Sequence, residues 1–355
     1  MSKRLATIAA FLTIGLYIGA LAAPMAASAH EVYVLTPQQI SQGLAASSPD
    51  PFTAVPAHEK LFLIWGTITA VAMLLVMTAS VSPFFERLCD PFLMKLKKYA
   101  PLIGRATLGL SIMASGYFSS FFGPELPMDA SFPPAAAHAL GLILLVAGAL
   151  VCLGFLTRLI SFLGICLFAV LIYQYHLYML TYVNYLGELI LFLILGGGMW
   201  SLDKAVPALA KIEGLFASVA DRLEKYSFFI LRVLFGLALF FASFYAKFLH
   251  SDLALATVND YHLTNYFHFT PLFLVLGAFI IESLLGLCFT FGFEIRFAAI
   301  FFTFFLTLSI LFFGEAVWPH IILFGVNLTL FFHGYDKYTL EMAVVQRQRE
   351  GEPVL

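Results

Sequence analysis

The stretch PLFLVLGAFIIESLLGLCFTFGF, residues 271–293, is mostly apolar and contains one charged side chain, Glu282. A helix needs about 20 apolar residues to cross the hydrocarbon core of a bilayer, so this stretch has the length of a membrane span. Backbone N–H and C=O groups find no water in lipid, and a helix satisfies them internally. The stretch therefore predicts a transmembrane helix.

Other apolar runs of similar length lie on both sides of this one. Together they place spans at residues 61–81, 102–122, 136–155, 159–180, 185–200, 228–248, 271–293, 297–313 and 317–332. Charged residues make up only 11% of the chain, whereas soluble domains carry about 25%. We therefore expect an all-α, polytopic helical membrane protein with about nine transmembrane helices. Membrane lipid is the expected surrounding, and nucleic acid is not an expected partner because no basic cluster is present.

The basic residues indicate which side of the membrane each loop faces. If residue 61 starts outside, the inner loops and adjoining helix ends hold Arg87, Lys95, Lys97, Lys98, Arg105, Arg158, Lys204, Lys211, Arg222, Lys225, Arg232, Arg296, Lys337, Arg347 and Arg349. Apart from the first residues of the chain, only Lys60 and Lys247 fall on the other side. Cytoplasmic loops carry an excess of Lys and Arg. The pattern predicts a bacterial-type plasma (inner) membrane protein with its N-terminal segment outside and its C-terminus in the cytoplasm.

Residues 1–29 have the features of a secretory signal peptide. A basic start is followed by an apolar stretch, and Ala27-Ser28-Ala29 fits the small-residue rule for cleavage before His30. An uncleaved signal anchor is the alternative, and both interpretations place His30 outside the cytoplasm.

The polar segment 30–60 is too short to bury a core of its own, so we expect it to lie on the membrane domain. Within it, Thr36 and Pro37 predict the N-cap and the first residue of a helix. Residues 61–81 then form the first span.

Two long stretches of the chain resemble each other. Each has an Arg and a Gly in its first helix, a Gly and an Arg in an inner turn, and an Asp-Lys pair after its last helix. These are Arg105, Gly109, Gly154, Arg158, Asp203 and Lys204 in one stretch, and Arg232, Gly236, Gly292, Arg296, Asp336 and Lys337 in the other. The shared order predicts a tandem duplication of a four-helix unit.

We call residues 101–204 the first unit and residues 228–338 the second unit. An even number of helices gives both units the same orientation, as in parallel repeats. The linker 205–227 is then cytoplasmic and is expected to form an amphipathic surface helix. Residues 339–355 are expected to form a cytoplasmic tail.

The second unit resembles the DoxX family of four-helix membrane proteins. That family's pattern is an Arg and a Gly opening the first helix, a Lys closing it, a Glu within the second helix, and a Gly and an Arg in a tight turn. Here these positions are Arg232, Gly236, Lys247, Glu282, Gly286, Gly292 and Arg296. The first unit keeps Arg105, Gly109, Gly148, Gly154 and Arg158 but has Ser120 and Leu144 where Lys247 and Glu282 align. The resemblance implies a membrane location and a link to redox complexes, because some relatives are subunits of a thiosulfate:quinone oxidoreductase.

Glu282 is the most unusual side chain for its position. A carboxylate at the bilayer centre costs at least about 2.5 kcal/mol, so it should be paired, protonated or facing a cavity. The stem of Lys247, at the end of the preceding helix, is long enough to bend toward Glu282. The two residues form either a proton-coupled or quinone-binding site or an ion pair that fixes helix packing. Glu188 is a further candidate for a ligand or proton site, although its place early in its run, near the outer interface, favours a solvated rim role. We expect any chemistry mainly in the second unit.

Most histidines map to the outer side, where a metal or a proton could bind. The candidate metal ligands are His30, His58, His262, His268, Glu315 and His320. After cleavage, the α-amine and imidazole of His30 would form a bidentate copper-binding pair. The alternative is that these are ordinary interfacial histidines, because none shows the close spacing of a metal motif.

Three functions remain open at this stage. The first is a DoxX-like subunit of a quinone-linked membrane redox system, with Lys247 and Glu282 framing a site for a small lipophilic ligand and other redox subunits as partners. The second is a transporter or channel for protons, metals or small solutes, since parallel repeats around polar groups suit alternating access. The third is a noncatalytic scaffold or assembly factor, in which the polar residues fix packing.

Overall fold

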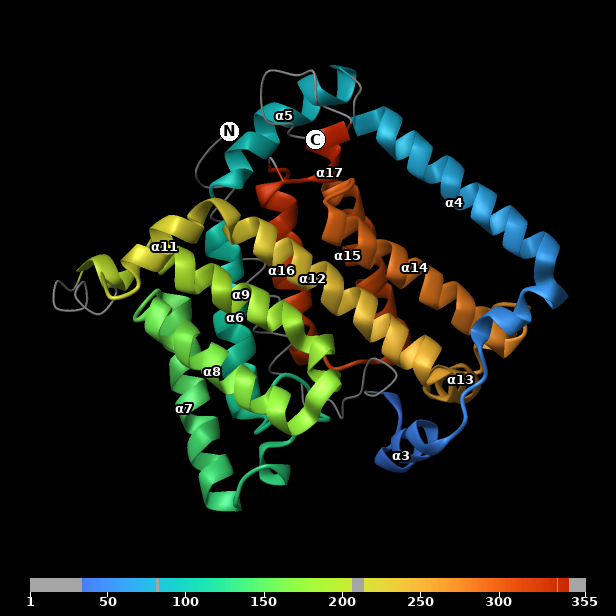
Figure 1. Cartoon of the computed structure of the whole chain (residues 1–355), viewed down its shortest axis with the longest axis horizontal. Helices are drawn as coiled ribbons and strands as arrows, with labels where there is room; N and C mark the ends of the chain where they lie inside the picture. The colour runs from blue at the N-terminus through green and yellow to red at the C-terminus, as the bar shows by residue number, and fades with distance from the viewer. Residues whose placement is uncertain (1–33, 81–82, 206–213, 337, 345–355) are drawn as a thin grey trace.

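A computed structural model describes residues 34–80, 83–205, 214–336 and 338–344 (Figure 1). Within these ranges the chain is helical, and its one β-type pairing is an isolated bridge between Ser120 and Pro127. The signal peptide predicted at 1–29, His30, Lys337 and most of the predicted tail lie outside the described residues.

Helices occupy all the places where the sequence predicts membrane spans. They are α4 (Glu59–Ser80), α6 (Ala100–Tyr117), α7 (Pro134–Leu153), α8 (Thr157–Tyr175), α9 (Val183–Leu195), α12 (Ser227–Phe244), α14 (Pro271–Phe291), α15 (Ile295–Phe313) and α16 (Ile321–His333). Six helical stretches in the described chain are long and apolar enough to cross a membrane. They contain α4, α7, α8 with α9, α12, α14 and α15, while α6 is outside this set and the Trp318–His333 stretch that holds α16 is shorter. These helices indicate a multi-pass membrane protein.

Short elements connect these helices. They are α3 (Pro37–Ala45), η1 (Pro51–Ala54), η2 (Pro56–His58), α5 (Pro83–Lys97), η3 (Met128–Ala130), η4 (His176–Tyr182), η5 (Leu202–Ala205), α11 (Ala217–Leu223), η6 (Glu224–Tyr226), η7 (Tyr245–Leu249), α13 (Ser251–Asp260), η8 (Leu263–Asn265), η9 (Trp318–His320) and α17 (Leu340–Val344). In the linker, α11 is helical as predicted, but residues 206–213 lie outside the described ranges.

The polar N-terminal segment lies on the second unit, as predicted from its length. Thr36 caps α3 at Pro37, and its hydroxyl and the Gln39 side chain form a reciprocal capping box. Gln39 Nε2 donates to Asp260 Oδ2 at 2.7 Å, and the Ser251 hydroxyl donates to the Pro49 carbonyl at 2.5 Å. Both contacts hold the segment against α13.

The two units pack their first two helices in the same way. A Cβ atom at Gly109 would lie 2.7 Å from the carbonyl oxygen of Gly148, and one at Gly236 would lie 2.5 Å from that of Gly286. Only glycine allows two helix backbones to approach this closely. In each unit, these glycines bring α6 onto α7 and α12 onto α14.

The first and last helices of each unit form the contact between the units. Helix α6 packs on α16, and α9 packs on α12 (Figure 1). Each unit therefore contributes one early and one late helix to the centre of the molecule. Helix α4 lies apart at one edge, where its apolar side chains are largely exposed and suit a lipid surrounding.

The motif arginines hold backbone carbonyls at helix ends. Arg105 donates to the carbonyls of Gly197, Met199 and Trp200, and Arg232 donates to those of Phe289, Thr290 and Tyr338. Arg158 donates to the Ile194 carbonyl at the end of α9, and Arg296 donates to the Phe331 carbonyl near the end of α16. A basic side chain at a helix C-terminus satisfies carbonyls that lack partners within the helix. These four residues therefore stabilise the framework.

The turns that follow α7 and α14 have the same backbone conformation. Gly154 (φ +68°) and Gly292 (φ +70°) end the two helices in the left-handed region, which suits glycine. Two residues later, Leu156 and Glu294 also have positive φ. The inner turns predicted from the Gly and Arg spacing therefore have one geometry in both units.

Candidate functional site

Lys247 and Glu282 form an ion pair near the end of α12. Lys247 Nζ lies 2.9 Å from Glu282 Oε2, and the two side chains are 5% and 18% exposed. Lys247 belongs to η7, a π-helical turn that continues α12, and such turns are frequent at functional sites. Glu282 is the one charged residue of α14. The approach expected from the sequence is therefore present, with the carboxylate as the more accessible partner.

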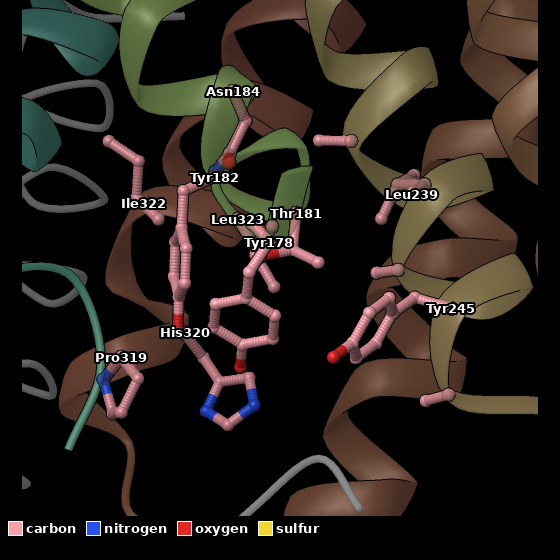
Figure 2. Close-up of a pocket in the computed structure, with 13 residues that line it drawn as sticks. Tyr178, Thr181, Tyr182, Asn184, Leu239, Tyr245, Pro319, His320, Ile322 and Leu323 are labelled. Carbon is pink, nitrogen blue, oxygen red and sulfur yellow. Dashed lines mark hydrogen bonds between the residues drawn. The ribbon is translucent and has the colours of Figure 1, made fainter. Parts of the chain in front are cut away.

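A cleft lies on the other side of the same turn, between the two units (Figure 2). It is lined by η4 and α9 of the first unit and by α12, η7, η9 and α16 of the second. Tyr178, Tyr245 and His320 point into this space from three different elements. The rings of Tyr178 and Tyr245 meet edge to face, with centroids 5.4 Å apart. The cleft thus combines an apolar wall with hydroxyl and imidazole groups.

The loop between α6 and α7 holds the tyrosines of the cleft. Tyr178 donates its hydroxyl hydrogen to Glu125 Oε1 at 3.0 Å, and Tyr182 donates to the same oxygen. Phe122, three residues earlier in this loop, packs on the ring of Tyr185 with centroids 4.4 Å apart. The loop therefore covers this end of the first unit and fixes the cleft on that side.

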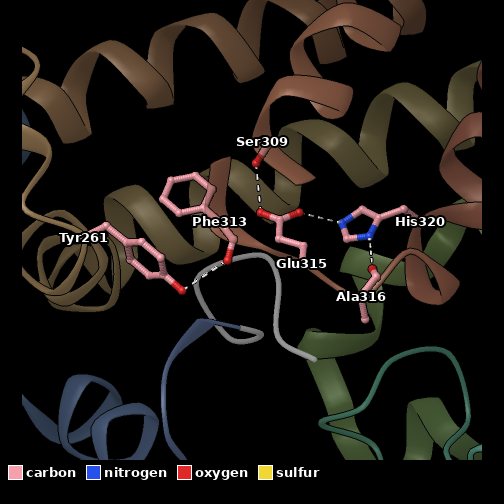
Figure 3. Close-up of polar contacts among 6 residues, drawn as sticks. All are labelled: Tyr261, Ser309, Phe313, Glu315, Ala316 and His320. Atoms are coloured by element: carbon pink, nitrogen blue, oxygen red, sulfur yellow. Dashed lines mark hydrogen bonds and ion pairs between the residues drawn. The ribbon is translucent and has the colours of Figure 1, made fainter. Parts of the chain in front are cut away.

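Glu315 and His320 form a buried pair at the edge of the cleft (Figure 3). His320 Nε2 lies 3.4 Å from Glu315 Oε2, and the side chains are 1% and 3% exposed. Ser309 donates to Glu315 Oε1 at 2.9 Å, and His320 Nδ1 lies 2.8 Å from the Ala316 carbonyl. Because a carbonyl only accepts, Nδ1 carries a hydrogen and Nε2 faces the carboxylate. This arrangement can hold a proton between His320 and Glu315.

Glu188 does not lie at a solvated rim, so that prediction is wrong. Its side chain is fully buried in α9, with 0% exposure. Neither carboxylate oxygen has a hydrogen-bond partner among the described residues. The reason is that α9 packs on α8, α12, α6 and α16, which places Glu188 inside the helix bundle. The first unit therefore buries a carboxylic acid of its own.

The candidate metal ligands are not brought together. In the described parts of the chain, no group of three or more His, Cys, Asp or Glu side chains could hold a metal ion. His58 Nε2 contacts the Thr270 hydroxyl at 2.9 Å, while His262 and His268 are exposed. Glu315 and His320 do meet, but as a pair. His30, the proposed copper ligand, lies outside the described residues.

Sequence reasoning missed the tyrosines and Asn184 of the cleft. Tyr178, Tyr182 and Asn184 lie within or just before an apolar run, where aromatic and amide side chains are usually assigned to packing. The available signal was the mixed composition of residues 173–185, which carries five tyrosines interleaved with His176, Thr181 and Asn184. Such a polar-aromatic stretch between two apolar runs is unusual for a membrane span.

Comparison of the chain with protein-family models, with curated proteins and with solved structures found no match.

Proposed function

We propose that the protein is a DoxX-like subunit of a membrane redox system that binds a small lipophilic ligand of the quinone class. The observation that carries this proposal is the Lys247–Glu282 ion pair. A buried pair is rarely more stabilising than well-packed apolar side chains, so stability gives little reason to keep it. A charged pair with an accessible carboxylate, in a helix that is otherwise apolar, supports a ligand-binding role.

The cleft next to this pair has the composition of a small-ligand site. Ala238, Leu239 and Ala242 supply an apolar wall, and Tyr245 supplies a hydroxyl group. Small-molecule sites typically combine apolar walls with a few placed polar groups. A quinone ring presents a flat apolar face, and its carbonyl oxygens accept hydrogen bonds from donors such as the Tyr245 hydroxyl. Its hydrocarbon tail would remain in the lipid.

The π-turn η7 connects the cleft to the ion pair. Tyr245 and Ala246 of this turn line the cleft, while Lys247 reaches Glu282 on α14. A ligand in the cleft would therefore contact the turn that positions the ammonium group. This supports the proposal that Lys247 and Glu282 influence the ligand's binding and its electron affinity.

The proposal includes the architecture inferred from the sequence. In it, the two units are parallel copies with nine membrane spans in a plasma membrane, the cleft opens to the extracytoplasmic side, and other redox subunits are partners. The support is the pairwise agreement of the arginine, glycine and turn geometry in both units. The excess of Lys and Arg in the predicted inner loops supports the orientation.

A photoreactive, short-tailed quinone tests the proposal on the full chain in lipid nanodiscs. We expect saturable binding and cross-links to peptides that carry Tyr178, Tyr245 or His320. Glu282→Gln should weaken binding, because it removes the charge that pairs with Lys247. Glu59→Gln, an exposed carboxylate at the start of α4, is the matched control and should bind as the natural chain does.

Absence of saturable binding, or equal binding by Glu282→Gln, would overturn the proposal. Glu282-dependent uptake of protons or solutes into proteoliposomes, without quinone binding, would instead establish a transporter. Loss of partner association alone would establish a scaffold.

A further inference from the structure

Glu188 lies on the helix face that leads from the cleft into the first unit. Asn184, one turn earlier on α9, lines the cleft, and residues four apart lie on the same face of a helix. Between them, Gly187 faces Leu231 and Leu234 of α12. Glu188 is therefore one helical turn deeper than the cleft, close to the contact between the units.

The surroundings of Glu188 are dry and lack a positive charge. Among the described residues, no ion pair or hydrogen bond reaches its carboxyl group, and the side chain is fully buried. An isolated carboxylate in such a place is strongly disfavoured, and the group binds a proton instead.

Other polar atoms near Glu188 are incompletely satisfied. The Asn184 side-chain oxygen has no hydrogen-bond partner among the described residues, and it is nearly inaccessible to solvent. The buried hydroxyls of Tyr185 and Ser111 lie close to each other. Buried polar atoms normally have partners, so a group of incompletely satisfied ones indicates a place for a proton carrier such as water.

The second unit has no acid at the matching position. Gly196 follows α9 and Gly334 follows α16, so these two glycines align the helices. Val326 lies as far before Gly334 as Glu188 lies before Gly196, and it is also fully buried. The carboxyl group is therefore not part of the framework that the units share.

We propose that Glu188 is a proton-binding site of the first unit, and that its proton exchanges with the extracytoplasmic cleft past Asn184. This inference does not depend on which ligand the cleft binds.

Infrared spectroscopy of the full chain in lipid tests the protonation directly. The spectrum of the natural chain minus that of Glu188→Gln should show, at neutral pH, the C=O stretching band of a protonated carboxylic acid. Glu188→Asp should keep such a band at a shifted position, which guards against a folding defect in the amide variant. Absence of a Glu188-dependent band would mean that the group is ionised and would overturn the proposal.

Deuterium exchange tests the route. On transfer to D₂O the band should move to lower frequency, and Ala242→Phe, which fills the cleft from α12, should slow this exchange several-fold. Ala169→Phe, on an exposed position of α8, is the matched control and should exchange at the natural rate. A band that never shifts would show a purely structural acid. An unchanged rate in Ala242→Phe would exclude the cleft as the route.

Discussion

The first helix of the second unit continues beyond the position at which the first helix of the first unit ends. Helix α12 runs on through the π-turn η7, which carries Lys247 to Glu282. Helix α6 ends at Tyr117, and after Ser119 (φ 51°) the chain forms the bridge from Ser120 to Pro127. The arginines, the close glycines and the inner turns agree between the units, so the framework is shared and the polar chemistry is not.

The two units bury their acids in opposite ways. Glu282 has Lys247 at 2.9 Å, and Leu144, at the aligned position of α7, packs against the apolar core. Glu188 has no partner among the described residues, and its counterpart is Val326. One unit therefore holds a charge pair and the other an isolated acid. This difference is the basis for our proposals of ligand binding next to the charge pair and of proton binding at the isolated acid.

The largest effect is expected when the charge pair of the second unit is broken. Lys247→Met leaves the Glu282 carboxylate unpaired in a mostly apolar contact, which should cost about 3–5 kcal/mol of unfolding free energy. The matching change in the first unit, Ser120→Ala, removes a side chain without a charged partner and should cost much less. Thermal unfolding of the purified variants checks the comparison, and equal losses would show that the pair adds no special interaction.

The close helix packing should be equally sensitive to a Gly→Ala substitution in both units. Gly109→Ala and Gly236→Ala each place a methyl group within 2.7 Å of a backbone carbonyl oxygen of the neighbouring helix. Such overpacking costs about 1–3 kcal/mol. Gly277→Ala on α14 is the matched control, because nothing lies within 4 Å of a Cβ atom there. It should be neutral or slightly stabilising. A loss confined to one unit would contradict a shared framework.

Glu188, the isolated acid, should tolerate a neutral replacement better than Glu282, the paired acid. Glu188→Gln exchanges one uncharged group for another of similar shape and should cost less than about 1.5 kcal/mol. Glu282→Gln leaves Lys247 without its counter-charge and should cost more. Unfolding of both variants under the same conditions measures the difference. A larger loss for Glu188→Gln would mean that Glu188 is ionised and paired.

The smallest effect concerns His250, which follows the π-turn of the second unit. Burial lowers the pKa of His250 below its ordinary value of about 6.5. Between the lowered pKa of the folded chain and the ordinary value, the unfolded chain binds more protons than the folded chain. The free energy of unfolding therefore falls as the pH drops below about 6.5. His250→Gln should flatten this part of the pH–stability curve. An unchanged slope would show that other groups cause the pH dependence.

The helices were predictable because each membrane span needs a long apolar run. Glu282 was conspicuous because it is the single charged residue in one of these runs. The contact of Lys247 with Glu282 was also predictable, because the lysine stem is long enough to reach the neighbouring helix. The burial of Glu188 was not, because it depends on how α9 packs against α8 and α12, which is set by tertiary contacts. The cleft combines residues more than a hundred positions apart, such as Tyr178 and His320.

The direct test of the ligand proposal is to remove both charges of the Lys247–Glu282 pair, because the first unit has the uncharged Ser120 and Leu144 at these positions. The double variant Lys247→Met with Glu282→Leu removes both charges together, so neither is left unpaired and the fold should persist. Its affinity for a short-tailed quinone in nanodiscs is compared with that of the natural chain. We predict at least about tenfold weaker binding, a difference of about 1.4 kcal/mol, at similar thermal stability. Equal affinity in a stably folded double variant would contradict the account.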